Sequence, residues 1–445
     1  MWGAVLKRDR AGRAMSHDLG LWMDRKSTAA CTRSMHPADR ESGVTPRALH
    51  VAALPFPTHQ GTQAALRAMM EALARAGRTS ALLAYASAGY DDVLDFLLHR
   101  AAEPLPYRSL RSGPSAHKLL ADAALARALR ALRCRTRPEL IVAHHVEAAA
   151  IACAPGLPAR RRRSAAPACL FFAHTDLEAE LPAYAHPAFA RWLAHAGASL
   201  DGLLLRRAHA VAAISPALSR RMRARADDRA ARIQCVLPPW PVPPTMEAHE
   251  RAAARASFGI GHEPVLLYAG NLDRYQGWED VVHALAALPD TVLLVGTCSD
   301  RAPLLHEARR AGVAGRVRFG AIDSEPARRR LHACADLGVV PRRAEGGLPI
   351  KLLDALARGL PCAIAPRARA GLTLDGAAHV AGADDAHALA SAVRELLASP
   401  ARRQQLAHCS RRYVALHHSD AAFLTAYDRV CAAALAEARA RFGNS

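Results

Sequence analysis

DLGVVPRRAEGGLPIKLLDALARGLPCAIAP, residues 336–366, is the stretch of sequence that decides the fold. Its first apolar run, Leu337–Val340, has the length and β-branched content of a buried strand. The loop that follows contains two adjacent glycines, and Pro349 suits the first turn of a helix, where a missing N–H costs nothing. Gly359 ends this helix, and a second apolar run follows it. The stretch therefore predicts a strand, a glycine loop, a helix and a second strand.

The glycine loop and the start of the helix are suited to binding an anion such as a diphosphate. Gly346 and Gly347 let a ligand approach the backbone closely, and free N–H groups at a helix start attract negative charge. Lys351 adds a positive charge, and Asp354 lies on the same helix face, where its carboxylate can accept hydrogen bonds from sugar hydroxyls. The spacing alone equally allows a structural alternative, in which the glycines only end a strand and Lys351 and Asp354 form a solvated pair.

Residues 345–366 resemble the donor-site motif of the retaining glycosyltransferases of family 4, which have the GT-B fold. In that family a first carboxylate contacts the transferred sugar, and a second carboxylate on the helix holds the nucleotide ribose. Asp354 matches the second position, as Asp in place of the usual Glu, whereas Glu345 lies one residue farther from it than the motif requires. The resemblance implies catalytic roles for Glu345 and Asp354. It also implies donor-binding roles for Gly346, Gly347, Lys351 and Asp354.

Length and composition limit the class of protein. A chain of 445 residues is long enough for two domains, and no uninterrupted apolar run approaches the ~18 residues that span a bilayer. The N-terminus lacks the apolar core of a signal peptide. The ten cysteines occur singly, without a Cys-x-x-Cys pair, which argues against a zinc site or disulfide framework and fits a reducing compartment. We therefore expect a cytoplasmic protein.

The chain is strongly basic, with a formal net charge of +19, which favours anionic partners. Ala and Arg are abundant throughout the sequence, so the charge by itself is weak evidence for any one partner. No aromatic residues alternate with basic runs such as residues 160–163, and no nucleic-acid-binding motif is present. We expect no nucleic-acid partner, and peripheral contact with the anionic inner face of a membrane is the more plausible consequence.

The folded part is expected to begin after residues 1–46, which lack periodicity and are predicted to be a flexible tail. A strand at 48–54 is followed by a loop and by a helix at 64–76. This opening resembles the first glycine-rich loop of the family, which lies between acceptor and donor, and a simple turn is the alternative. The resemblance implies that three loop residues bind the acceptor: Gly61, Thr62 and Gln63.

Two predicted strands of the first half end at histidines. The run Ala168–Ala173 leads into His174, and a side chain at the carboxyl end of a parallel strand faces the crevice where α/β sheets bind ligands. The family places a histidine after such a strand, near the transferred sugar, so the resemblance implies a catalytic role for His174. The competing candidates are His144 and His145, at the end of another strand, and His144 is expected to bind the acceptor. A single histidine is more often structural, and that alternative stays open.

A proline-rich segment, PPWPVPP, marks the boundary between two domains, because clustered prolines favour an extended connection. Beyond it, the loop at 270–277 resembles the other donor-site motif of the family, in which an Arg follows the first Gly and a Lys precedes the last. Asn271 and Gln276 occupy those positions here, so Arg274 and Lys351 are expected to supply the charge instead. The loop residues expected to bind the donor are Gly270, Asn271, Arg274 and Gln276.

Strands that alternate with helices predict parallel sheets on both sides of this boundary. The predicted fold class is α/β, namely a GT-B fold of two Rossmann-like domains facing a central cleft. The predicted parts are a tail (1–46), an acceptor domain (47–237), a linker (238–245), a nucleotide-sugar donor domain (246–410) and a C-terminal helix that packs back towards the first domain (411–445).

The predicted function is transfer of a hexose from a nucleotide-diphosphate sugar to a glycan, lipid or small-molecule acceptor, as in polysaccharide or glycolipid biosynthesis. The sequence contains no Asp-x-Asp triplet, so we expect neither a metal nor a cofactor, and the resemblance implies retention of anomeric configuration. Two alternatives stay open: a nucleotide-sugar epimerase on the same fold and a non-catalytic nucleotide-sugar binder. An oxidoreductase is the least favoured class, because no Gly-x-Gly-x-x-Gly follows a strand.

Overall fold

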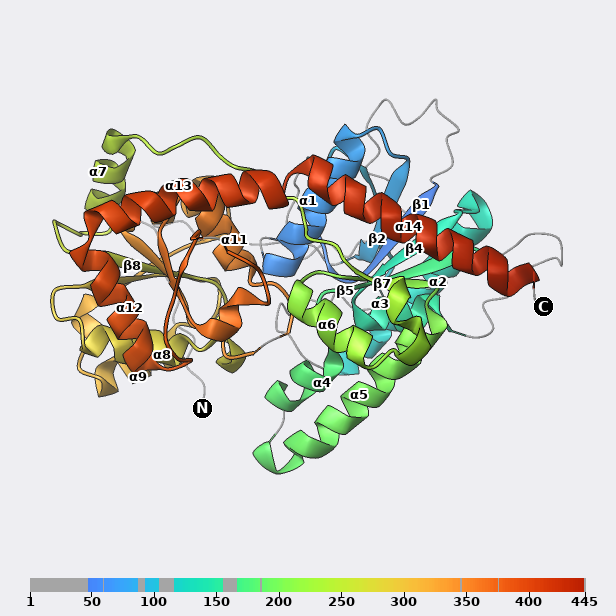
Figure 1. Ribbon diagram of the computed structural model, residues 1–445, viewed down its shortest axis with the longest axis horizontal. Coiled ribbons are helices and arrows are strands. Elements are labelled where there is room, and N and C mark those ends of the chain that lie inside the picture. Colours follow the sequence, from blue (N-terminus) through green and yellow to red (C-terminus); the bar gives the residue numbers. More distant parts are fainter. Residues whose placement is uncertain are drawn as a thin grey trace, which may run out of the picture. The chain divides into compact units, whose positions relative to one another are not determined.

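Two parallel β-sheets form the framework of the computed structural model (Figure 1). The first sheet has the strand order β3-β2-β1-β4-β5-β6-β7, and the second has the order β10-β9-β8-β11-β12-β13. Every neighbouring pair of strands is parallel. The predicted tail lies outside the described residues. Those residues are 47–58, 60–86, 93–103, 116–154, 166–184, 186–344, 346–374 and 376–443.

The inner strands of the first sheet are apolar runs that are buried along nearly their whole length, as expected of parallel strands covered by helices on both faces. Its strands are β1 (Ala48–Pro55), β2 (Ser80–Tyr85), β3 (Leu97–Ala101), β4 (Leu140–His144), β5 (Ala168–Ala173), β6 (Ala210–Ala213) and β7 (Ile233–Cys235). Its helices are α1 (Gly61–Arg75), α2 (Ala116–Thr136), α3 (His145–Ala152), α4 (Leu177–Glu180), α5 (Ala190–Arg207) and α6 (Pro216–Ala224).

The second sheet repeats this alternation of strand and helix. Its strands are β8 (Val265–Ala269), β9 (Val292–Gly296), β10 (Val317–Gly320), β11 (Leu337–Val340), β12 (Cys362–Ile364) and β13 (His379–Val380). Its helices are α7 (Ala248–Ser257), α8 (Trp278–Ala286), α9 (Ala302–Arg310), α10 (Glu325–Cys334), α11 (Ile350–Ala357) and α12 (Ala386–Ala398). Two of these helices begin at a capping residue, since the side-chain oxygens of Ser324 and Asp385 accept hydrogen bonds from backbone N–H groups in the first turns of α10 and α12.

Each sheet has one point at which the strand order reverses. In the first sheet β1 lies between β2 and β4, and in the second sheet β8 lies between β9 and β11. At such a switch point the loops after the two neighbouring strands turn to opposite sides, which leaves a crevice at the carboxyl ends of the strands. The topology therefore provides two crevices, one per sheet.

The C-terminal segment differs from the single helix expected at 411–445. It forms two helices, α13 (Pro400–His417) and α14 (Asp420–Gly443), separated by a break at His418. Hydrogen bonds to the proline-rich segment hold this break, since the His418 ring donates to the Pro238 carbonyl (2.8 Å) and Trp240 N–H donates to the His418 carbonyl (2.7 Å). Helix α13 contacts α11 and α12, whereas α14 contacts β5, β6 and β7.

The strands predicted on both sides of the boundary are confirmed, with β5 and β11 at the predicted bounds. Three strands, β3, β7 and β13, were not predicted, and each lies at the edge of its sheet. None of the helices in the described part of the chain is both long and apolar enough to cross a membrane.

Candidate functional site

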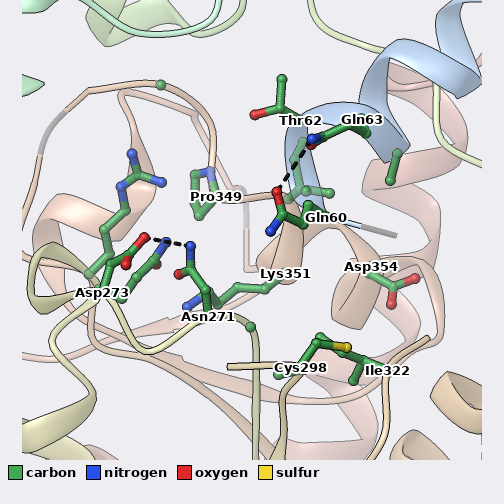
Figure 2. A pocket seen from close by; sticks show the side chains of 18 of the residues that line it. Gln60, Thr62, Gln63, Asn271, Asp273, Cys298, Ile322, Pro349, Lys351 and Asp354 are labelled. Carbon is green, nitrogen blue, oxygen red and sulfur yellow. Dashed lines mark hydrogen bonds between the residues drawn. The ribbon is translucent and has the colours of Figure 1, made fainter. Parts of the chain in front are cut away.

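A pocket of about 810 Å³ lies at the carboxyl ends of strands from both sheets. The first sheet contributes the segments after β1, β5 and β6, and the second contributes the segments after β8, β9, β10 and β11. Figure 2 shows side chains from both groups around the same space. The two switch-point crevices therefore open into one site.

The start of α1 forms one wall of the pocket. Here Gln63 Nε2 donates a hydrogen bond to Gln60 Oε1 at 3.3 Å (Figure 2). A Cβ built at Gly61 would lie 3.3 Å from Cβ of Ile350, the first residue of α11, so the glycine lets the starts of two helices approach each other. The pocket thus has two helix N-termini at its edge, and both can attract an anion.

The loop after β8 forms the opposite wall, together with Lys351 from α11 (Figure 2). A Cβ at Gly270 would lie 3.0 Å from Lys351 Nζ, so a side chain at this position would press on the ammonium group. Lys351 Nζ donates to Tyr268 Oη at 3.1 Å and lies 4.2 Å from the centre of that ring. Burial, and then the nearby Arg342, lower the pKa of Lys351 well below its ordinary value. A phosphate at this position would restore the charge of the ammonium group.

Gly347 joins the two walls. Its φ is +71°, and a Cβ built on it would lie only 2.5 Å from the backbone oxygen of His174. A side chain at this position would therefore suffer both backbone strain and a clash with the loop after β5. Gly347 is therefore required by close packing of backbone against backbone, in addition to any ligand, whereas a Cβ at Gly346 would lie at an ordinary 3.5 Å from Asp176 Oδ1.

Asp354 presents a carboxylate to the pocket from the second turn of α11 (Figure 2). Its Oδ1 accepts from Arg358 Nε at 3.1 Å, and its Oδ2 lies 3.8 Å from His332 Nε2. Burial acts to raise the pKa of Asp354, but His332, Arg358 and Arg328 outweigh it and the pKa is lowered. Lys351 and Asp354 each bond to other residues, so the solvated pair between them, considered from the sequence, does not form.

Two arginines in the lining were missed by sequence analysis. Arg342 follows β11 by two residues, is 7% exposed and donates to the carbonyls of Ala344 (3.0 Å) and Gly346. Arg328 enters from α10 and donates to Glu325 at 2.9 Å. A basic residue directly after a strand at the switch point was the available signal for Arg342. Arg328 has no comparable signal, because the α10 segment is rich in arginine.

Several lining residues carry buried polar atoms that have no hydrogen-bond partner among the described residues. Buried polar groups are nearly always paired in proteins, so a cluster of exceptions in one pocket indicates contact with a ligand. A ligand that satisfies them must offer both donors and acceptors. The atoms are Thr58 Oγ1, His174 Nδ1, Asn271 Oδ1, Gln276 Oε1 and Arg328 Nε.

Most residues proposed from the sequence meet in this pocket. Those in the lining are Gly61, Thr62, Gln63, His174, Gly270, Asn271, Gln276, Gly347, Lys351 and Asp354. Among the others, Arg274 is exposed on its loop, Gly346 is buried beside Asp176, and His144 is fully buried. None of these three lines the pocket. Glu345 lies outside the described residues.

A row of buried rings leads away from His174. His174 Nε2 is 3.0 Å from His144 Nδ1, His144 Nε2 is 2.9 Å from His50 Nδ1, and His50 Nε2 is 3.0 Å from the hydroxyl of Tyr427. His145 stacks on His174 with ring centres 4.5 Å apart. Burial lowers the pKa of all four histidines, to about 3 for His50 and His145, so the rings are neutral at pH 7. His144 therefore lies behind His174 and supports it.

Known proteins are similar to this chain in part of its sequence and in its whole fold. Residues 263–399, just under a third of the chain, match the family model described as glycosyl transferases group 1. The sequence has no match among curated proteins. The matched segment contains both donor-site motifs proposed from the sequence.

Solved structures match across both sheets. Sucrose-phosphate synthase from Thermosynechococcus elongatus is 20% identical with a TM-score of 0.70, covering 90% of this chain and all of that one. WaaG, a glycosyltransferase of lipopolysaccharide biosynthesis, is 18% identical with a TM-score of 0.63, over 86% and 99% of the two chains. Anabaena HepE in complex with UDP-glucose is 14% identical with a TM-score of 0.65, over the same shares.

The fold and the matched segment together define a class of protein, the glycosyltransferases with the GT-B fold. The predicted fold class, two Rossmann-like α/β domains, is confirmed, and so is the prediction of a glycosyltransferase enzyme. The structure of HepE holds UDP-glucose, a nucleotide sugar.

Proposed function

We propose that this protein transfers a hexose from a nucleotide-diphosphate sugar to a hydroxyl group of an acceptor, with retention of configuration and without a metal ion. The observation that carries the proposal is one pocket at the switch points of both sheets, with cations and a carboxylate on one wall and helix N-termini at its edge. Retention rests on the resemblance of the α11 motif to family 4 enzymes, and metal independence rests on the absence of an Asp-x-Asp triplet.

The donor binds to the second-sheet wall. Asp354 accepts hydrogen bonds from the ribose hydroxyls, since its lowered pKa keeps it ionised. The diphosphate lies against Gly347 and the first turn of α11, where Lys351 and Arg342 balance its charge. Charge that develops on the leaving diphosphate is stabilised by the same fixed groups, which are already oriented before the reaction.

The acceptor binds nearer the first-sheet wall, at Gly61, Thr62 and Gln63, with His174 between the two substrates. In the reaction the bond between the anomeric carbon and the diphosphate oxygen breaks. The acceptor oxygen bonds to the same carbon, and its proton leaves with the nucleoside diphosphate. An epimerase would need no acceptor, so dependence of donor consumption on an added glycan or lipid separates the two activities.

The proposal is tested by comparing the two carboxylates that bind Arg358. Asp354 lines the pocket, whereas Glu325 accepts from the other side of the same guanidinium at 2.7 Å and does not line it. Asp354→Asn should weaken binding of a nucleoside diphosphate at least tenfold, because a hydrogen bond to a charged acceptor is worth about 1.5–3 kcal/mol. Calorimetry with UDP, GDP and ADP measures this, after a thermal-shift screen in which ligand at ~100 times its Kd stabilises by ~2.7 kcal/mol.

Glu325→Gln is the matched control, since it removes the charge of a carboxylate that binds Arg358 but does not itself line the pocket, while the amide oxygen of Gln can still accept from Arg358 and from Arg328. It should leave nucleotide affinity within about twofold of wild type. Equal affinities for Asp354→Asn and wild type, in a variant that remains folded, would contradict the donor-site assignment of α11.

We also propose that the enzyme is cytoplasmic and contacts anionic lipid peripherally, and the net charge of +19 supports this. Near the start of α5, the side chains of Phe189 and Trp192 are 61% and 69% exposed beside Arg191. A glycan or a lipid acceptor fits this location equally.

A further inference from the structure

The hydrogen bonds along the row of buried rings behind the pocket run in one direction from donor to acceptor. Tyr427 comes from α14, His50 from β1, His144 from the end of β4 and His174 from the loop after β5. These four side chains, called the histidine chain below, are at most 5% exposed. Both ring nitrogens of His50 and of His144 are within 3.0 Å of the next member. Only the last nitrogen, His174 Nδ1, lacks a partner among the described residues.

A neutral imidazole carries one N–H, so each ring donates through one nitrogen and accepts through the other. All hydrogen bonds in the histidine chain can form only if every donor points the same way along it. Two arrangements satisfy this condition. In the first, Tyr427 O–H donates to His50 and the direction continues to His174, which keeps a proton on Nδ1. In the second, His174 donates from Nε2, the direction is reversed, and Nδ1 is left as an acceptor.

The surroundings of Tyr427 favour the first arrangement. Among the described residues, the hydrogen-bond partner of the Tyr427 hydroxyl is His50 Nε2, at 3.0 Å. A phenol is a stronger donor than an imidazole N–H, and an imidazole nitrogen is a far better acceptor than a phenol oxygen. In the reversed direction the phenolic proton would have no nitrogen or oxygen acceptor among the described residues, so it belongs on the bond to His50. Burial also raises the pKa of Tyr427 well above its ordinary value, which keeps the phenol protonated.

We propose that Tyr427, His50 and His144 are positioning residues that hold His174 as the Nδ1–H tautomer, so that His174 donates a hydrogen bond to an oxygen of the bound sugar nucleotide instead of acting as a base. This inference rests on the proposed function for the identity of the ligand. The tautomer itself depends only on the geometry of the histidine chain. His145, stacked on the His174 ring at 17°, fixes the plane in which the N–H points.

The tautomer is measured directly by NMR of the protein labelled with 15N-histidine, because a protonated ring nitrogen and a bare one differ widely in 15N shift. Signals of His174, His144 and His50 are assigned by loss in His174→Asn, His144→Asn and His50→Asn. The expected result is an Nδ1–H tautomer for all three rings at pH 7. A wild-type spectrum in which His174 carries its proton on Nε2 would overturn the proposal, whatever the activity of the enzyme.

Tyr427→Phe tests the origin of the direction, since it keeps the ring and removes only the hydroxyl. With no phenolic proton the two arrangements differ little in energy, so His174 should become a mixture of tautomers. Tyr413→Phe is the matched control, because Tyr413 is equally buried on the neighbouring helix α13 and packs on His417 and His418 outside the histidine chain. An unchanged single tautomer in Tyr427→Phe contradicts the proposed role of Tyr427.

Kinetics separate this inference from the proposed function. Tyr427→Phe should lower kcat of sugar transfer in proportion to the fraction of His174 that loses Nδ1–H, about twofold for an even mixture of tautomers, with nucleotide affinity unchanged. A change in KM alone contradicts the inference. If wild type transfers no sugar, the proposed function fails while the tautomer measurement still stands.

Substitutions of His174 itself distinguish a donor from a base. The amide nitrogen of His174→Asn occupies the position of Nδ1 and can donate a hydrogen bond but cannot take up a proton. His174→Asn should therefore keep more activity than His174→Ala. Equal loss of activity in both folded variants would indicate a base at this position and overturn the proposal.

Discussion

The two walls of the pocket differ in the charge of the side chains that line them, although these side chains come from equivalent positions in two similar sheets. On the second-sheet wall, ionisable groups face the pocket, among them Lys351, Arg342 and Asp354. On the first-sheet wall the lining is neutral, and His174 continues into uncharged rings. Both walls follow the same topological rule, so the difference comes from the side chains that each sheet places after its strands.

Charged side chains are present beneath the first-sheet wall, but they neutralise one another in ion pairs below the pocket surface. Asp176, directly after the His174–Thr175 turn, is fully buried and lies 2.6 Å from Arg221 and 3.1 Å from Arg225. Under the proposed function, the contrast assigns one end of a sugar nucleotide to each wall, since a diphosphate needs cations in contact with it and a sugar needs hydrogen bonds. The predictions below test this division, from the largest expected effect on nucleotide binding to the smallest.

Gly347→Ala should abolish nucleotide binding, because Gly347 is the point at which the two walls touch. A methyl group there meets the His174 carbonyl at 2.5 Å and also forces an Ala into a φ of +71°. The strain costs about 1–2 kcal/mol and the overpacking about 1–3 kcal/mol more. Denaturant unfolding and calorimetry with a nucleoside diphosphate measure the two effects.

Gly312→Ala is the control for strain alone, because Gly312 has a φ of +70° and nothing within 4 Å of a Cβ. It should cost only the strain and leave binding unchanged. If Gly347→Ala were no worse than Gly312→Ala, the two walls would not depend on each other at this contact.

Lys351→Met should lower diphosphate affinity about tenfold, because it removes a charged donor and keeps the aliphatic stem. Burial lowers the pKa of free Lys351, and a bound diphosphate raises it, so binding takes up a proton. Affinity in wild type should therefore fall as pH rises above the pKa of free Lys351, and this dependence should be absent in Lys351→Met. Titration calorimetry in buffers of different ionisation enthalpy measures the proton uptake.

Arg274→Met removes the same charge from the neighbouring loop, where Arg274 is exposed and outside the lining. Its affinity should stay within about twofold of wild type. A loss equal to that of Lys351→Met would move the diphosphate towards the loop after β8.

Asp201→Asn should alter stability and leave binding unchanged, since Asp201 belongs to the buried network under the first-sheet wall. Burial, and then the neighbouring Asp176, raise the pKa of Asp201 to about 7. The folded protein therefore holds a proton that the unfolded chain releases near pH 4, and this stability is lost as pH rises from about 4 through 7. Urea unfolding at several pH values should show a smaller decline in Asp201→Asn than in wild type.

Excess EDTA should not change the rate of sugar transfer, because the sequence offers no Asp-x-Asp triplet to clamp a metal on the diphosphate. The cations of the second-sheet wall take that role. Activity that EDTA removes and Mg²⁺ or Mn²⁺ restores would assign part of the charge balance to a metal.

The sequence predicts correctly those parts of the molecule in which the local residue pattern matches the position of the segment in the folded structure. Strand β11, the glycine loop and α11 are contiguous, and each has its own signal in composition or spacing. Strands β3, β7 and β13 lie at sheet edges, where partial exposure admits His, Arg and Gln and weakens the apolar pattern. Pattern therefore identifies the centre of each sheet better than its edges.

The candidate site is predictable to the same extent. His174, Lys351 and Asp354 belong to local motifs and line the pocket, and Arg342 was within reach as a basic residue after β11. His50 carries no local signal, because its function arises only when distant segments bring four rings into one row. Arg274 lies in the predicted loop but projects outward, since spacing along a loop does not fix the direction of a side chain.

The contact between Tyr427 and His50 also has a consequence during synthesis of the chain. The two residues are 377 positions apart, so at ~5–20 residues per second a ribosome needs about 20–75 s to make the second after the first. Throughout that interval β5 and β6 lack the apolar face of α14, and the ring of His50 lacks its phenol. The domain that is made first is therefore finished last, and any nascent chain released before α14 emerges carries an incomplete active site.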